Sequence, residues 1–599
     1  QDVLRTVPGV NIRGDEGGFG AIPNIGIRGL NPSRSSKVLL LEDGAPIQPS
    51  LFISNASYYS PPVERIGGIE VLKGASGLQY GPSNIGGVIN YLTKTPSQGF
   101  KLTGKVGNYG YRLAEIEAGG KSSTNGAIGG INLIQSESSG YQGNGFKMYD
   151  ILMKGGIEVA QNQWLSVKYT HYDNNINTSY VGLRPTQYIN RTKDNPAPND
   201  RFITQRNAVD INHSLEIDSD TKINTLLYWS KLSRDYWRQS IVKRTQDATI
   251  FKACNVGADC LVGRNREFQM LGLDSRINHA YKALGIANEA EFGVRLHTES
   301  QINQLVSSKT LAYSGRVSLH EDNKANSIAL YGQNRFLLTD NFALIPGVRV
   351  ESYNQTRSNV ITGKSGSAKN MEIIPQIGAT WQLIPQAQAY GSIYKGFAPA
   401  QLATAIDDKG VDQQLAPERS TNMELGLRGR SGAFSYDSAI FSMNFSNQIV
   451  NQSLAAGISK ANGGKSLHQG AEASLGYEVG HGWAINANAT YIPVAKFVGT
   501  NSLGRDGNRI PYTPKLTSNL GVSYEKNGFN TLVSLNYLSN QYADSANTVA
   551  PNAIGTLGEV PAFTTVNWSA NYAINKDWKV FGVINNVFDK RYISSRSPD

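Results

Sequence analysis

The chain has 599 residues, including 62 glycines and 29 tyrosines, and carries a formal net charge of +10. Its length would suit several soluble domains, but only 17% of the residues are charged, and no apolar run reaches the roughly eighteen residues of a transmembrane helix. The basic excess forms no Lys/Arg block and accompanies no nucleic-acid motif, which argues against that class and favours an anionic small ligand.

Residues 1–98 are predicted to form a compact domain of their own. Their apolar runs are short and continuous, as in VLLL (38–41) and VINYL (88–92), with Gly and Pro between them. Continuous runs are typical of strands buried on both faces, as in an α/β domain. Arg28, in GIRG, is a charged residue in an otherwise buried-looking segment.

From residue 99 onward the pattern has a period of two. In WLSVKYTHY (164–172) apolar and polar residues alternate, and VNWSANYAI (566–574) does the same near the other end. About twenty such segments of about ten residues predict an antiparallel transmembrane β-barrel. A barrel that wide has an open or a plugged lumen, and residues 1–98 would be the plug.

Two further features belong to the predicted barrel. Aromatic residues at strand ends suggest girdles at the membrane interfaces: Tyr169, Tyr172, Trp229, Tyr236, Trp237, Tyr390 and Tyr394. Long loops are expected on one side of the barrel, at 173–208, 234–266, 397–417, 447–468 and 539–562.

Cys254 and Cys260 are the only cysteines, and they lie in a polar segment with Gly257 between them. A disulfide in an oxidising compartment is the favoured interpretation, with two unpaired thiols or half a metal site as alternatives. The seven histidines form no ligand pair, so no metal site is expected. No nucleophile elbow, Walker loop or acid pair is found, so no enzyme is expected.

Four longer segments resemble a known family: GIRGLNPSRSSKVLLLEDGAPI (26–47), YGPSNIGGVIN (80–90), LAPERSTNMELGLRGR (415–430) and VFGVINNVFDKRY (580–592). They resemble the TonB-dependent outer-membrane transporters of the siderophore receptor family, most of all the ferric citrate (ferric dicitrate) receptor type. The resemblance implies a 22-stranded antiparallel β-barrel in the bacterial outer membrane, occluded by an N-terminal α/β plug. The plug would span 1–98 and the barrel 99–599, with the last barrel strand missing from the chain and any TonB box or signalling domain lying upstream of it.

The resemblance also implies a function. A monomer would take up an iron chelate, most like ferric citrate, driven by the TonB–ExbB–ExbD system, in contact with lipid and lipopolysaccharide and without a cofactor. Alternatives are a catecholate or hydroxamate xenosiderophore or another metal chelate. Outside the family, a passive porin, a surface adhesin or a secreted multi-sandwich protein remain as alternatives.

Family members lock the plug to the barrel with two plug cations and two barrel glutamates. By resemblance these are Arg28, Lys73, Glu424 and Glu472. Lys73 stands where the family more often has arginine, and it forms point-charge contacts in place of a fork. A charge buried between plug and wall needs such partners.

Ligand contacts are expected at the plug apices 13–23, 32–36 and 47–55 and at the loop arginines. The apical candidates are Arg13, Phe19, Arg34, Gln48, Ser50 and Phe52. The preferred loop candidates are Arg191, Arg201, Arg206 and Arg238, chosen from a set that also holds Arg184, Arg234, Arg244, Arg264 and Arg266. Guanidinium forks suit the carboxylates of a ferric citrate complex, and arginines beside Tyr236 and Trp237 would also suit a catecholate.

Overall fold

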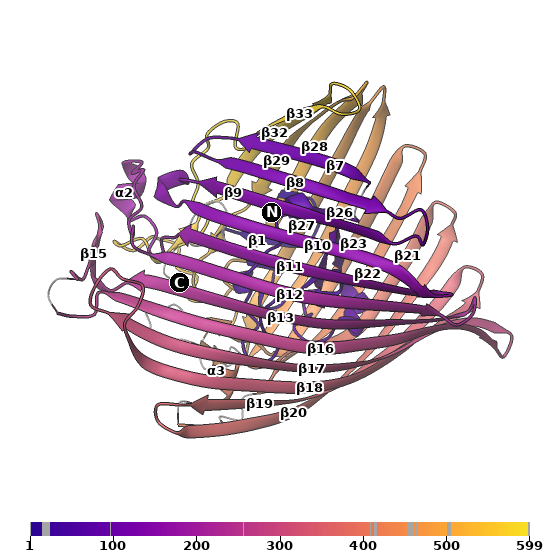
Figure 1. Ribbon diagram of the computed structural model, residues 1–599, viewed down its shortest axis with the longest axis horizontal. Helices are drawn as coiled ribbons and strands as arrows, with labels where there is room; N and C mark the ends of the chain where they lie inside the picture. The colour runs from indigo at the N-terminus through magenta and orange to yellow at the C-terminus, as the bar shows by residue number, and fades with distance from the viewer. Residues whose placement is uncertain are drawn as a thin grey trace.

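The computed structural model describes residues 2–14, 24–95, 98–254, 257–407, 409–412, 416–451, 460–462, 464–499 and 505–596. A small N-terminal domain, the plug (residues 2–95), lies inside a closed antiparallel barrel (Figure 1). Within the described residues, no helix has the length and apolar character needed to cross a membrane.

Consecutive barrel strands pair with one another in an antiparallel sense, and the strand order returns from β33 to β7. The strands are β7 (Gly99–Val106), β8 (Arg112–Lys121), β9 (Ile128–Ser138), β10 (Phe146–Ala160), β11 (Gln163–Asn177), β12 (Arg201–Glu216), β13 (Thr221–Gln239), β16 (Leu261–Ala283), β17 (Ile286–Ser308), β18 (Arg316–Thr339), β19 (Phe342–Asn359), β20 (Lys364–Ile384), β21 (Ala387–Ala398), β22 (Glu418–Ser431), β23 (Phe434–Asn447), β26 (Lys465–Gly480), β27 (Trp483–Val498), β28 (Leu516–Lys526), β29 (Phe529–Leu538), β32 (Phe563–Ala573) and β33 (Lys579–Ile584). The described residues therefore hold 21 barrel strands, whereas the resemblance implies 22 for a complete barrel.

The barrel strands bury polar residues and expose apolar ones, which is the reverse of the pattern in a water-soluble protein. On β11, Lys168 and Asn174 are buried toward the plug, while Val167 is 45% exposed on the outer face. Leu271 on β16 and Leu425 on β22 are exposed in the same way. An apolar outer face and a polar inner face suit a wall that stands in lipid and encloses a polar lumen.

The plug is built around a four-stranded sheet of order β4-β3-β6-β5, in which β3 and β6 are parallel. Its elements are α1 (Asp2–Arg5), β1 (Val10–Arg13), β2 (Asn24–Ile27), η1 (Ser33–Ser35), β3 (Leu39–Glu42), β4 (Ala45–Pro46), η2 (Val63–Arg65), β5 (Ile66–Leu72), η3 (Gly74–Tyr80) and β6 (Val88–Thr93). The three leucines of the VLLL run lie in β3, Val38 directly precedes it, and all four are almost fully buried, as predicted.

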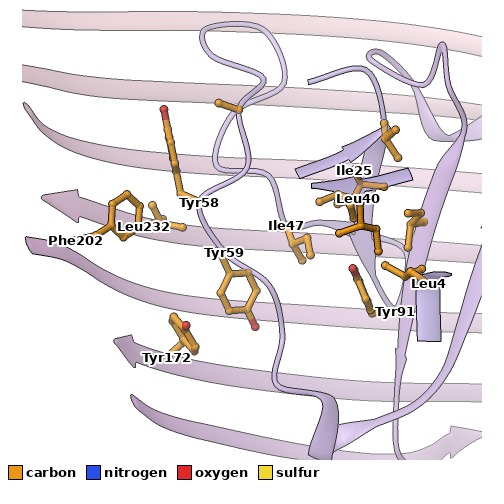
Figure 2. Packing of buried hydrophobic residues seen from close by; sticks show 14 of the residues in the cluster. Leu4, Ile25, Leu40, Ile47, Tyr58, Tyr59, Tyr91, Tyr172, Phe202 and Leu232 are labelled. Atoms are coloured by element: carbon orange, nitrogen blue, oxygen red, sulfur yellow. The ribbon is translucent and has the colours of Figure 1, made fainter. Parts of the chain in front are cut away.

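The core of the plug continues into the barrel wall. Figure 2 shows Leu40 and Ile47 packed inside the plug, with Tyr59 directed toward Tyr172 and with Tyr58 beside Phe202 and Leu232. The Tyr58 and Phe202 ring centroids are 6.4 Å apart, and those of Tyr59 and Tyr172 are 4.9 Å apart. Apolar contacts thus join the outer half of the plug to β11 and β12.

Short turns join the strands on one side of the barrel and long connections join them on the other. The long connections carry η4 (Tyr141–Gly143), α2 (Pro185–Ile189), β14 (Ile241–Arg244), β15 (Thr249–Phe251), α3 (Leu402–Ala405), β24 (Ile449–Asn451), β25 (Lys460–Asn462), β30 (Gln541–Tyr542) and β31 (Glu559–Val560). The loop predicted at 539–562 is confirmed.

Four of the predicted loops were too long, those at 397–417 and 447–468 by a few residues and the first two by many. Strand β11 runs to Asn177 and β12 begins at Arg201, so the connection is 178–200, and the next is 240–260. Arg201, Arg206 and Arg238 therefore lie on strands and not in loops. At these strand ends the inward positions hold arginines as well as rings such as Phe202 and Tyr236, so the alternation of apolar and polar residues that marks a strand is lost.

The girdle prediction was wrong for Tyr172, Tyr236, Trp237 and Tyr394, which are all buried. Tyr172 and Tyr236 pack in the cluster between plug and wall, and Trp237 packs with Leu261. Tyr172, Tyr236 and Tyr394 occupy inward positions of their strands, whereas Trp237, on the other face of β13, is covered by Leu261 and Val306, so aromatic character alone did not identify lipid-facing residues.

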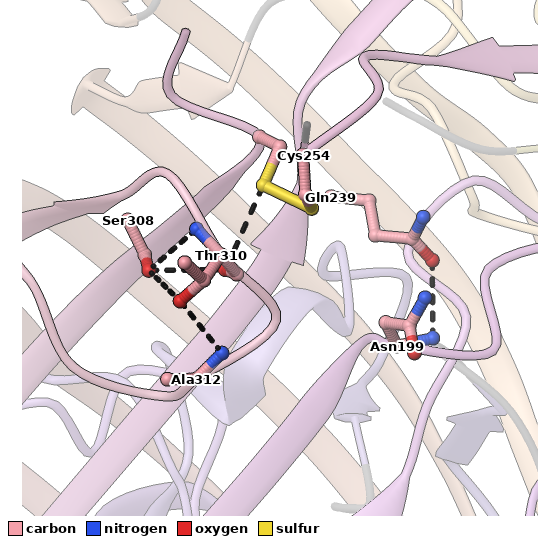
Figure 3. The surroundings of a disulfide bond; sticks show 7 residues. Asn199, Gln239, Cys254, Ser308, Thr310 and Ala312 are labelled. Atoms are coloured by element: carbon pink, nitrogen blue, oxygen red, sulfur yellow. Dashed lines mark hydrogen bonds between the residues drawn. A yellow bond between two sulfur atoms is a disulfide. The ribbon is translucent and has the colours of Figure 1, made fainter. Parts of the chain in front are cut away.

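Cys254 and Cys260 are joined in a disulfide at the end of the connection that leads into β16 (Figure 3). The Cys260 amide donates to the Ser308 carbonyl over 2.8 Å. On the neighbouring connection, the Asn199 amide donates to Gln239 Oε1 over 3.0 Å. The disulfide thus fixes a point where the long connections meet the strands.

Candidate functional site

Two groups of charged residues link the plug to the wall and are candidates for function. The first is the four-charge cluster of Arg28, Lys73, Glu424 and Glu472. Arg28 Nη1 lies 2.9 Å from Glu424 Oε2, and its Nη2 lies 2.9 Å from Glu472 Oε1. Lys73 Nζ lies 2.6 Å from the same oxygen of Glu472. The structure therefore brings together all four residues that the resemblance implied.

The backbone and the charges of the plug are adapted to this cluster. Gly9 and Gly74 have positive φ, and a Cβ at either position would collide with the carboxylate of Glu472 or Glu424. Burial opposes the charge on Arg28, but the carboxylates of Glu472 and Glu424 outweigh it, so the pKa of Arg28 lies above its ordinary value. Arg28 is only 3% exposed, and its charge is fully paired.

The second group, the arginine–tyrosine cluster, lies toward the long connections and consists of Arg34, Tyr58, Arg234 and Arg266. Arg266 Nη1 donates to the Tyr58 hydroxyl over 2.9 Å. The guanidinium carbon of Arg234 lies 4.4 Å from the centre of the Tyr58 ring, and that of Arg34 lies 5.9 Å from it. Three guanidiniums from the plug and two barrel strands therefore converge on one phenol.

The charges of this cluster act on the phenol. Burial raises the pKa of Tyr58, but the positive charges of Arg266, Arg234 and Arg34 outweigh it and lower the pKa to about 7. The same positive field would attract an anion that reached the cluster.

Further arginines extend the cluster toward the outside. The guanidinium of Arg238 lies between two rings, 3.5 Å from the centre of Tyr180 and 3.9 Å from that of Tyr236. Arg264 is exposed next to them on β16. This part of the surface offers both cationic and aromatic contacts.

The predicted barrel arginines are distributed more widely. Arg206 is buried, with its guanidinium 4.9 Å from the centre of the Tyr59 ring and a hydrogen bond to Thr170 Oγ1. Arg201 donates to the carbonyls of Pro198 and Asp200, and Arg191 is exposed just after α2. Arg206 thus contacts the residue that follows Tyr58 in the chain, and Arg238 lies four residues after Arg234 on β13.

The predicted apical residues are mostly occupied inside the protein. Gln48 is fully buried and its amide bonds plug backbone groups. Ser50 Oγ donates to Glu299 Oε1 of the wall over 2.6 Å, and the Phe52 ring packs 5.0 Å from that of Tyr353. Arg13 is buried with its guanidinium 3.9 Å from the centre of the Tyr512 ring. Phe19 lies outside the described residues.

Sequence reasoning missed Tyr58 and ranked Arg234 and Arg266 below other arginines. The available signal was the pair Tyr58-Tyr59 directly before Pro61-Pro62, which puts two aromatic rings at a plug apex. Which arginines face these rings depends on the registers of β13 and β16, and periodicity does not reveal those registers. In the described residues, no group of three or more His, Cys, Asp or Glu could hold a metal ion.

Comparisons with known proteins agree with this architecture. Residues 1–88 match the TonB-dependent receptor plug domain, and residues 154–587 match the TonB-dependent receptor-like β-barrel. The chain is 22% identical to the pesticin receptor of Yersinia enterocolitica and 23% identical to the ferrienterobactin receptor of Escherichia coli, each over 98% of this chain and 85% of the relative.

A crystal structure of the ferric citrate transporter FecA in the unliganded form superposes with a TM-score of 0.85 at 23% identity, over 99% of this chain and 90% of that one. The structure of the ferric yersiniabactin uptake receptor FyuA from Yersinia pestis has a TM-score of 0.79 at 17% identity, over 99% and 90%. Because the barrel model alone covers more than half of the chain, the chain belongs to the TonB-dependent receptors of the bacterial outer membrane.

Proposed function

We propose that this protein imports an anionic ferric chelate, most like ferric citrate, and that the TonB–ExbB–ExbD system supplies the energy. The observation that carries the proposal is the arginine–tyrosine cluster on the long-connection side, which is the extracellular side of such barrels. Iron would stay chelated, because the cluster offers guanidiniums and a phenol and so recognises the chelate's own groups.

The chemistry of the cluster matches free carboxylates. A guanidinium donates two parallel hydrogen bonds to a carboxylate, and such charge-assisted bonds are roughly twice as strong as neutral ones. Arg34, Arg234 and Arg266 place three guanidinium groups around the Tyr58 side chain, and exposed Arg264 follows on β16. The likeness to the structure named as a ferric citrate transporter supports this choice of chelate.

A catecholate siderophore is the second candidate, and a separate observation favours it. Arg238 lies between the rings of Tyr180 and Tyr236, so an aromatic ligand could exchange ring contacts with this stack. One relative is named as a ferrienterobactin receptor, which is consistent with this alternative.

The test is a binding competition with purified protein, using ferric citrate and a ferric tris-catecholate. Arg266→Gln removes one guanidinium from the cluster, and a hydrogen bond to a charged group contributes about 1.5–3 kcal/mol, so the affinity for ferric citrate should fall roughly 10- to 150-fold. Arg430→Gln is the matched control, because Arg430 pairs with Glu478 beside a short turn on the opposite side.

Three outcomes are informative. Tight ferric citrate binding that Arg266→Gln weakens supports the first candidate. Binding of the catecholate alone, lost in Arg238→Gln, replaces it with the second. If neither chelate binds and neither rescues growth of iron-starved cells that carry the receptor, uptake of these chelates is rejected.

We also infer that the four-charge cluster latches the plug to the wall. Arg28 and Lys73 lie on the plug, Glu424 and Glu472 lie on β22 and β26, and three of the four are less than 10% exposed. Removing one partner of such a buried pair leaves an uncompensated charge. Exposed basic side chains on the outer connections, such as Arg191, are proposed to meet acidic lipopolysaccharide.

A further inference from the structure

A column of charged and polar side chains runs down the inner face of β16 and β17. From the extracellular end it holds Arg266, Glu299, His297, Arg295, Asp274 and Arg276. Asp274 binds both arginines at the lower end, with Asp274 Oδ2 3.0 Å from Arg295 Nε and Oδ1 3.2 Å from Arg276 Nη2. The column therefore contains three guanidinium groups and two carboxylates.

The column connects the arginine–tyrosine cluster at its upper end with a cavity at its lower end. Its upper end, Arg266, belongs to the arginine–tyrosine cluster. Below Arg276, the next inward residue of β16 is Asn278, and its partner on β17 is Glu291. Both line a cavity of about 860 Å³ on the short-turn, periplasmic side, which also reaches Lys73 and Glu424 of the latch.

At rest the plug covers every step of the column. The Tyr58 hydroxyl accepts a hydrogen bond from Arg266. Ser50 Oγ and the backbone amides of 51–53 all donate to Glu299 over 2.6–2.9 Å. The Phe52 and His297 ring centroids are 5.8 Å apart. Lower down, the Tyr80 carbonyl accepts from Arg295, and Gln79 Oε1 accepts from Arg276 over 3.0 Å.

The side of the plug that faces β10–β12 is held in a different way. There Arg65 pairs with Glu42 at 2.8 Å, and Lys168 of β11 lies 3.3 Å from Glu42 and 2.9 Å from both Asp43 and Asp210. These are direct ion pairs between buried side chains, which are costly to separate. On the β16–β17 side, Arg295 and Arg276 instead hold the Tyr80 carbonyl and the neutral side-chain amide of Gln79 in η3, and Glu299 holds backbone amides of 51–53.

We propose that the chelate crosses the lumen along the β16–β17 column, uncovered when segments 50–58 and 78–80 leave the wall, while the plug stays anchored at β10–β12. This inference rests on the proposed uptake of an anionic chelate. The charge along the path fits capture at the entrance and weak retention at the exit: the entrance is basic, whereas the charged residues that line the cavity are four cations and six carboxylates. An anion would therefore be attracted at the entrance but not held in the cavity, and the energy for its passage would come from the TonB system.

A tether tests the route. A Cβ on Gly347 of β19 would lie 2.9 Å from Leu78 Cδ2, so Leu78→Cys with Gly347→Cys can form a disulfide that fixes η3 to the wall. In the oxidised protein we expect unchanged ferric citrate binding and at least tenfold slower iron uptake, restored by a reductant. Wild-type protein with the same reductant controls for reduction of the native Cys254–Cys260 bond.

The matched control tethers the other face. Glu64 of η2 and Lys105 of β7 form an ion pair at 2.8 Å, so Glu64→Cys with Lys105→Cys can be joined by a short bismaleimide. Uptake within twofold of wild type is expected. Normal uptake through the oxidised Leu78–Gly347 tether would overturn the route, and so would a block by both tethers.

A second readout needs no chelate. Arg276→Gln weakens the hold on η3 and should raise the conductance of the protein in planar bilayers at least threefold, an increase that the oxidised tether abolishes. Arg428→Gln, which removes a guanidinium from the same cavity outside the column, should leave the conductance unchanged. No increase for Arg276→Gln overturns the route, whereas an increase without ferric citrate binding rejects only the proposed chelate.

Discussion

The phenol of Tyr58 is unusually acidic because three guanidiniums outweigh its burial and bring its pKa to about 7. Below that pH the phenol is neutral and the positive charges of Arg34, Arg234 and Arg266 are all available to a ligand. Above it, the phenolate neutralises one of them. An anionic ligand competes with the phenolate, so binding favours the protonated form of Tyr58.

Affinity for an anionic ferric chelate should therefore decrease as the pH rises through 7. A single coupled proton permits at most about a tenfold change in Kd per pH unit. Tyr58→Phe, which cannot ionise, should remove this dependence while leaving the affinity at pH 6 close to that of wild type. Titration of both proteins at pH 6, 7 and 8 with the same chelate checks this, because pH effects on the chelate itself are common to the two. Equal slopes would contradict the assignment of the proton to Tyr58.

At the scale of elements, the segment 50–53 is organised by a single carboxylate. Glu299 is fully buried and accepts from the amides of Leu51, Phe52 and Ile53 as well as from Ser50 Oγ. It also lies 2.9 Å from His297 Nε2. The backbone amides of the plug segment thus form an anion-binding nest around this carboxylate of the wall.

Glu299→Gln should loosen that segment without unfolding the plug. A hydrogen bond to a charged group contributes about 1.5–3 kcal/mol, so a loss of about 2 kcal/mol should speed amide exchange at 51–53 roughly 30-fold. Exchange at β3 should stay at the wild-type rate, because β3 pairs with β4 and β6 inside the plug. Hydrogen exchange read by mass spectrometry distinguishes the two segments, and unchanged exchange at 51–53 would show that Glu299 does not hold it.

Elements differed in how far the sequence could predict them. The sequence predicted both β3 and β11. A strand buried on both faces, such as β3, is a continuous apolar run, and a strand with one apolar face, such as β11, alternates between apolar and polar residues. The strand ends at Arg201 and Arg238 were not predicted, since arginines and aromatic rings share the inward positions there and leave no regular alternation. The side chains of Gln48, Ser50 and Phe52 were assigned to a ligand because they lie at a predicted apex, yet they are bonded within the plug or against the wall, which only tertiary contacts reveal.

At the scale of the whole molecule, the four-charge cluster joins positions up to 444 residues apart in sequence. No local pattern predicts such a meeting; here the resemblance to a family implied it, and the structure shows the ion pairs. The cluster lies at the border of the periplasmic cavity, whereas the arginine–tyrosine cluster lies at the other end of the lumen. The two roles that we propose, plug retention and chelate capture, are therefore assigned to separate residues.

Arg28→Met should consequently loosen the plug and leave chelate capture largely intact. Glu472 keeps Lys73 at 2.6 Å, but Glu424 loses its ion pair and retains a hydrogen bond from Ser392 Oγ. Breaking a buried pair by removing one partner costs about 3–5 kcal/mol, so the plug should become accessible to protease at lower urea than in wild type.

Adding Glu424→Gln removes the orphaned charge and should recover part of that loss, a rescue that a simple packing defect would not show. Ferric chelate affinity within threefold of wild type in both variants is expected, because neither touches the arginine–tyrosine cluster. A large loss of affinity together with the plug would instead mean that the two clusters act as one unit.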